Sequence, residues 1–119
     1  MASVLSLTLY NEKEKVLEIK DVSYKRVEDE ISFVHDEIKY KMGLHKEKLY
    51  FNRESDEFLF SLDITRNTCT YLLKETNAML NLQVKDCSLK KSKNEIILIY
   101  DIETMEGKNQ VNIYLKEGD

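Results

Sequence analysis

Histidine and cysteine, which often carry catalysis or bind metal, are few and scattered in this chain, and its abundant carboxylates fall on outward strand phases or in turns. The two histidines, His35 and His45, and the two cysteines, Cys69 and Cys87, have none of the spacings that hold a metal ion. The three glycines lie far apart, so they form no glycine-rich loop for phosphate. We therefore expect no enzymatic activity, no metal site and no cofactor.

Four polar residues fall on the apolar side of predicted strands, and these are the candidates for holding a ligand. Arg53 and Asp86 each continue a row of alternating apolar residues, and Tyr71 and Tyr100 bring hydroxyl groups into two further rows. A lone charge among apolar side chains is costly unless it is paired, so we expect Arg53 and Asp86 at the rim of the sheet. A ligand site needs a few such polar groups beside apolar surface. The alternative is that all four are ordinary rim residues.

The elements that would position these residues are β-strands in which every second residue is apolar. The alternation is clearest between Glu57 and Lys116. It gives the rows Phe58–Phe60–Leu62–Ile64, Cys69–Tyr71–Leu73, Leu80–Leu82–Val84, Ile96–Leu98–Tyr100–Ile102 and Val111–Ile113–Leu115. A period of two places each row on one face of a strand. Bulky side chains fill these rows, which favours a filled interior over a large cavity.

The first half of the chain continues the same pattern with shorter strands and one change of phase. Leu17 and Ile19 keep one phase, whereas Val22 and Tyr24 keep the other, which predicts a β-bulge or a sharp bend between them. Polar turns separate the strands, and no segment has a sustained helical period. A sheet with this many strands tends to curl and close, because closure removes its exposed edges. We expect residues 1–119 to form a single all-β domain, an antiparallel up-and-down barrel of about eight to ten strands.

The strand phase also bears on the two cysteines. Cys69 lies in an apolar row, whereas Cys87 shares a phase with the polar residues Asn81, Gln83 and Lys85. Thiols on opposite faces of a sheet cannot be bridged without backbone movement, so we expect no disulfide. Free thiols suit a reducing compartment.

A second kind of candidate site lies on the outward phase of the strands. Ile97 and Ile99 are apolar in a phase that should face solvent, and Leu59 and Leu72 are similar lapses on neighbouring strands. A strand that is apolar on both faces is expected to be covered on both. These four residues are therefore candidates for an interface with a second copy of the chain or another protein, unless another element of the same chain covers them.

Composition narrows the possible partners. The chain has 119 residues, of which 42% are hydrophobic and 34% charged, and this balance excludes a disordered chain. A formal net charge of −4 argues against general affinity for nucleic acid or an anionic membrane. The N-terminus lacks a basic segment followed by a long apolar stretch, and the longest apolar run, Ile96–Tyr100, is too short to span a bilayer. We expect a cytoplasmic protein.

One hairpin concentrates basic residues. Lys39, Lys41, Lys46 and Lys48 lie close in sequence, followed by Tyr50. Basic and aromatic groups on a sheet can hold single-stranded nucleic acid. We favour a solvated hairpin instead, because lysines also protect sheet edges and acidic residues interleave with these.

The order of these elements resembles a small bacterial family, the uncharacterised YwiB-like proteins. The similarity runs from Glu30 to Glu117 and is strongest in Leu80-Asn81-Leu82 and in Ile97-Leu98-Ile99-Tyr100-Asp101. The family usually has a glycine in the turn before the long strand, where this chain has Asn77-Ala78. The resemblance implies a lipocalin-like (calycin) barrel. The family has no established activity, so the resemblance assigns no functional residues.

Two functions remain open at this point. The first is a non-enzymatic barrel that binds a small apolar or amphipathic ligand in its interior or at its mouth. The second is a structural or interaction protein that acts through an outer sheet face, as a homodimer or with a protein partner.

Overall fold

The chain folds as an antiparallel β-barrel. The computed structural model describes residues 3–103 and 107–116, which contain eleven strands and no helix. The strands are β1 (Val4–Asn11), β2 (Glu14–Ser23), β3 (Lys25–Val27), β4 (Glu30–His35), β5 (Ile38–His45), β6 (Lys48–Glu54), β7 (Phe58–Asp63), β8 (Thr68–Leu73), β9 (Ala78–Lys91), β10 (Glu95–Ile102) and β11 (Asn109–Lys116).

The topology is that of an up-and-down barrel that is almost closed. The hydrogen-bonded order is β2-β1-β11-β10-β9-β8-β7-β6-β5-β4-β3, so every neighbour is also adjacent in sequence except the pair β1 and β11. The chain passes directly from β2 to β3 through Tyr24, and β2 lies beside β4 at the seam. The predicted fold is confirmed, with eleven strands instead of eight to ten. One reason for the larger number is that the bend at Tyr24 divides what would otherwise be one long strand.

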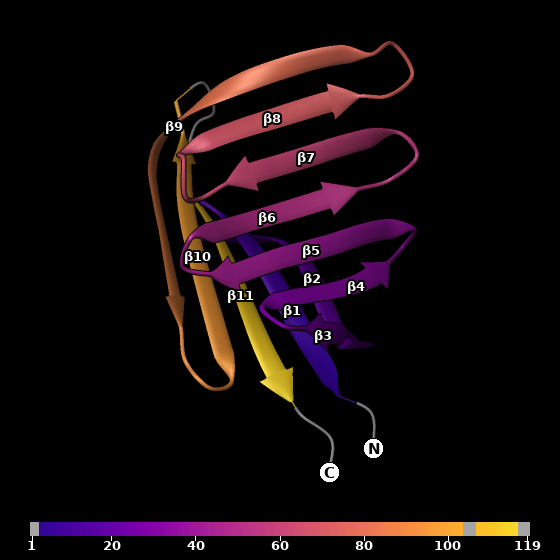
Figure 1. Cartoon of the computed structure of the whole chain (residues 1–119), viewed down its shortest axis with the longest axis vertical. Coiled ribbons are helices and arrows are strands. Elements are labelled where there is room, and N and C mark those ends of the chain that lie inside the picture. The colour runs from indigo at the N-terminus through magenta and orange to yellow at the C-terminus, as the bar shows by residue number, and fades with distance from the viewer. Residues whose placement is uncertain (1–2, 104–106, 117–119) are drawn as a thin grey trace.

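The barrel consists of two groups of strands that cross each other. Strands β4 to β8 run across the front of the molecule, and β10, β11, β1 and β2 run steeply behind them (Figure 1). Strand β9 belongs to both groups: residues 78–83 pair with β8 and residues 84–91 pair with β10. The register jumps between Val84 and Asp86, which leaves Lys85 as the extra residue of a β-bulge. Such a bulge bends a strand, and here it turns the corner between the two groups.

The predicted phase change near the N-terminus is also a bulge. Leu7 lies opposite Ile19, but Leu5 lies opposite Val22, so β2 has one residue more than β1 in this interval. Asp21 takes a positive φ of 51° there, and its N–H donates a hydrogen bond of 3.1 Å to the Ser6 hydroxyl. The bulge keeps apolar residues on the inner face on both sides of the bend, as the sequence predicted.

The interior is packed with large side chains. Leu7, Leu62, Leu98 and Val111 have no measurable exposure, and they come from both groups of strands. Tyr40 and Phe51 are the largest fully buried side chains. Complete burial of an aliphatic side chain contributes about 1.5–3 kcal/mol, so these inward rows are the main source of stability. The filled interior that the sequence predicts is confirmed where these buried residues lie, in the centre of the barrel.

Candidate ligand site at the barrel mouth

Arg53 lies on the inner face of β6, two residues after the fully buried Phe51 and near the end of that strand. Its neighbours in the antiparallel register are Tyr40 on β5 and Phe60 on β7. The guanidinium carbon lies 5.4 Å from the centre of the Tyr40 ring. The Nε atom is shielded from solvent and has no hydrogen-bond partner, and no ion pair within the described residues involves Arg53. Arg53 therefore brings an uncompensated positive charge to the inner face, at the inward position that the sequence predicted.

Tyr100 approaches this region from the opposite group of strands. It is 6% exposed, and its ring centre lies 6.2 Å from that of Phe60, the register neighbour of Arg53. Burial raises the pKa of the Tyr100 hydroxyl to about 12, although the positive charge of Arg53 acts in the opposite direction. The phenol is therefore neutral at neutral pH and retains its proton for donation.

Asn109, which the sequence reasoning missed, adds another donor beside Tyr100. It is the register partner of Tyr100 on β11 and is 5% exposed. Its Oδ1 accepts a hydrogen bond of 3.0 Å from Asn11 Nδ2, but its own Nδ2 is shielded from solvent and has no partner. A signal was present in the sequence, because Asn109 begins the alternating row that continues with Val111.

Tyr71 on β8 follows Arg53 and Phe60 in the cross-strand register, where the interior opens to solvent. It is the register neighbour of Phe60 and Leu80, and its ring stacks on that of Phe58 with centres 5.8 Å apart. Leu73 and Leu80 keep the inward phase but are 43% and 54% exposed. We call Phe58, Tyr71, Leu73 and Leu80 the barrel mouth. They belong to β7, β8 and the first half of β9, and β8 and β9 lie at the top of Figure 1.

The prediction for Asp86 was wrong. The bulge at Lys85 reverses the phase of β9, so Asp86 is exposed on the outer face, opposite Asp101. The same reversal turns Cys87 inward, opposite Tyr100 and against the core. The argument that Cys69 and Cys87 lie on opposite faces is therefore wrong too. Both thiols are free, and burial raises the pKa of each to about 11.

The structure divides the four outer-face candidates between two patches. Leu59 and Leu72 lie opposite each other on β7 and β8, and Met79 on β9 extends their row. Ile97 and Ile99 lie on β10, in the other group of strands, where both are half-buried. The four residues therefore do not form one continuous surface.

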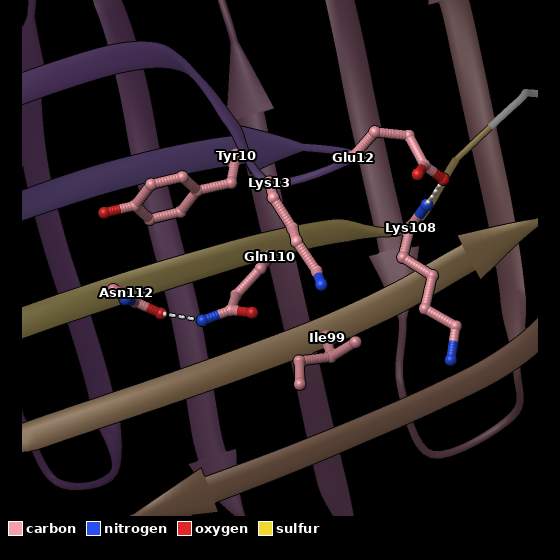
Figure 2. Close-up of a pocket in the computed structure, with 7 residues that line it drawn as sticks. All are labelled: Tyr10, Glu12, Lys13, Ile99, Lys108, Gln110 and Asn112. Carbon is pink, nitrogen blue, oxygen red and sulfur yellow. Dashed lines mark hydrogen bonds between the residues drawn. The ribbon is translucent and has the colours of Figure 1, made fainter.

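Ile99 is part of a groove on the outside of the barrel, with a volume of about 630 Å³. The other residues that line it carry polar or charged groups: Tyr10, Glu12, Lys13, Lys108, Gln110 and Asn112. Figure 2 shows Gln110 donating a hydrogen bond to Asn112, at 2.9 Å, and the Glu12 carboxylate accepting one from the Lys108 N–H, at 3.1 Å. These two hydrogen bonds hold Gln110, Asn112 and the Glu12 carboxylate in place along the groove.

Comparison with known proteins identifies the architecture. The crystal structure of the YwiB protein from Bacillus subtilis matches with a TM-score of 0.58, covering 98% of this chain and 90% of that chain. The chain has a YwiB-like barrel fold. Sequence identity over the match is 11%, so the likeness extends to the fold alone.

Comparisons at the level of sequence add no function to the YwiB-like fold. No protein-family model matches the chain. No protein with a curated description matches it either. Within residues 3–103 and 107–116, no helix is long and apolar enough to cross a membrane, and no three acidic, histidine or cysteine side chains group as metal ligands would.

Proposed function

We propose that this protein is a non-enzymatic, lipocalin-like (calycin) barrel of the cytoplasm that binds a small apolar or amphipathic molecule at its mouth. One observation carries the proposal: the inner face of β6 to β9 ends in the solvent-exposed side chains of Leu73 and Leu80, and the cross-strand register leads from Leu80 through Tyr71 and Phe60 to the unpaired Arg53. Apolar surface beside a few convergent polar groups is the usual composition of a small-molecule site. The packed centre of the barrel favours the mouth over the interior as its location.

Neighbouring residues of β9 provide a direct test. Leu80 points inward at the mouth and Met79 points outward, and the two are similarly exposed, at 54% and 59%. Native mass spectrometry and thermal shift with single-chain amphiphiles should detect a complex with the wild-type chain. We expect Leu80→Lys to abolish that complex and Met79→Lys to preserve it. Equal effects of both substitutions, or no binding of any amphiphile, would refute the proposal.

The groove beside Ile99 favours a second candidate function, an interaction protein that uses the outer face of β10. The half-buried Ile97 and Ile99 present aliphatic surface there to a second copy of the chain or to a protein partner. Sedimentation of the wild-type chain and of Ile97→Lys would test the homodimer. A wild-type dimer that Ile97→Lys dissociates would support it, and a monomer in both would exclude it.

A further inference from the structure

We propose that the mouth binds the anionic head group of its ligand, specifically a carboxylate, through Arg53, Tyr100 and Asn109. This inference rests on the proposed function and specifies its ligand: an amphipathic carboxylate with its acidic group turned inward and its chain lying over Phe58, Tyr71, Leu73 and Leu80. The same residues would discriminate against a neutral or cationic amphiphile of equal length.

The first argument is the shared character of the unsatisfied polar atoms. Two side-chain atoms of the described residues are shielded from solvent without a hydrogen-bond partner, Arg53 Nε and Asn109 Nδ2. Both are N–H donors, so both require an acceptor. Buried donors without partners are rare in folded proteins, since each costs about 1–3 kcal/mol. A ligand that offers several acceptor atoms would satisfy both.

The second argument is the position of the neutral Tyr100 hydroxyl. Tyr100 connects the two orphaned donors: Asn109 is its register partner, and its ring centre lies 6.2 Å from that of Phe60, the register neighbour of Arg53. Arg53, Tyr100 and Asn109 come from β6, β10 and β11, so both groups of strands contribute to the site. A carboxylate accepts hydrogen bonds at two oxygens and can therefore engage an arginine and a second donor together.

The third argument is charge. The guanidinium of Arg53 stacks on the fully buried ring of Tyr40 and has no carboxylate partner within the described residues. A partly buried charge without a counter-ion is costly, and a ligand carboxylate would supply that counter-ion. Phe60 is the register neighbour of Arg53 and Tyr71 is the next residue in the register, so the chain of the ligand would meet aromatic surface beyond its head group.

The test compares three amphiphiles with the same twelve-carbon chain: dodecanoate, dodecan-1-ol and dodecyltrimethylammonium. Binding to the full chain is measured by calorimetry and native mass spectrometry at pH 8, where the carboxylate is ionised. We expect dodecanoate to bind at least about tenfold more tightly than the alcohol, since a hydrogen bond to a charged group typically contributes that much. We expect the cation to bind most weakly.

Variants then assign the preference to the residues. We expect Arg53→Met to weaken dodecanoate binding by about ten- to a hundredfold and alcohol binding by less than about twofold. Arg66→Met removes the same charge from an exposed turn and should change neither. Asn109→Asp keeps the size of the side chain, replaces its donor by an acceptor, and should also weaken dodecanoate binding at least about tenfold. Arg53→Lys retains the charge and should retain part of the preference; circular dichroism confirms that each variant is folded.

The outcomes separate this inference from the proposed function. Equal binding of dodecanoate and dodecan-1-ol, or a carboxylate preference that survives Arg53→Met, would overturn the carboxylate site while leaving ligand binding at the mouth intact. If none of the three amphiphiles binds, the proposed function fails together with the inference.

Discussion

The guanidinium group of Arg53 and the ring of Tyr40 face each other across neighbouring strands, with the guanidinium carbon 5.4 Å from the ring centre. Tyr40 is 1% exposed, so the arginine rests on the edge of the packed interior. The stacking offers the charge a favourable contact but no hydrogen-bond acceptor. The relationship therefore combines a stabilising contact with an unsatisfied polar group, and the two effects oppose each other in the ligand-free protein.

We expect Arg53→Met to change the free energy of unfolding by less than about 1 kcal/mol. The substitution removes a cation–π contact of about 0.5–2 kcal/mol and, at the same time, the cost of the unpaired donor. Urea denaturation of the ligand-free variant and wild type would measure the difference. A loss greater than about 3 kcal/mol would mean that Arg53 is a structural residue whose partner lies within the chain itself.

The buried Tyr100 hydroxyl should make the barrel sensitive to alkali. Its pKa rises from an ordinary 10.0 to about 12 on folding, so the folded state favours the protonated phenol. The stability from this group is fully present below pH 10 and is lost as the pH rises through about 12. The shift corresponds to about 2–3 kcal/mol.

Tyr100→Phe keeps the ring and removes the ionisable group. We expect its unfolding free energy to fall less steeply than that of the wild type between pH 10 and 12, as followed by urea denaturation at several pH values. Tyr71→Phe is the matched control, because Tyr71 is only half-buried at the mouth. A variant Tyr100→Phe with the wild-type slope would assign the alkaline transition to other groups.

The bulge at Lys85 predicts that Cys87 is poorly reactive although β9 is largely exposed. Burial raises the pKa of Cys69 and Cys87 to about 11, so little thiolate is present at pH 8. We expect both thiols of the folded protein to react with a disulfide reagent about a hundredfold more slowly than the thiol introduced by Ser88→Cys, which is on the outer face. Urea should remove the difference. Rapid reaction of Cys87 in the native protein would place it on the outside and contradict the bulge.

Gly43 in the middle of β5 is required by Tyr50 on the neighbouring strand. A methyl group at position 43 would overlap the Tyr50 ring, whose hydroxyl donates a hydrogen bond to the Glu30 carboxylate. We expect Gly43→Ala to displace the ring and to destabilise the protein by about 1–3 kcal/mol, as measured by urea denaturation. The same substitution in a Tyr50→Leu background should cost less, and equal costs in both backgrounds would show that the two residues are not coupled.

Much of the fold follows from local alternation. A period of two puts apolar residues on one face of each strand. This pattern alone predicted that Arg53, Tyr71 and Tyr100 lie on the inner face. The phase change between Ile19 and Val22 predicted a bulge because neither phase could keep both residues inside. Asn77, in the turn before β9, takes a positive φ of 56°, a conformation that asparagine tolerates.

The sequence by itself thus determined the strands, their inner rows and an antiparallel barrel. Only the tertiary structure decided which residues of β9 face inward after Lys85. A one-residue bulge reverses the alternation there, and the residue types of Asp86 and Cys87 do not reveal the bulge. Only the tertiary structure brought Phe60 and Tyr100 within 6.2 Å, because strands that cross at a corner meet through packing and not through sequence spacing. For the same reason, the sequence could not show that Arg53 Nε and Asn109 Nδ2 lack hydrogen-bond partners, because burial and partners depend on how the two groups of strands pack.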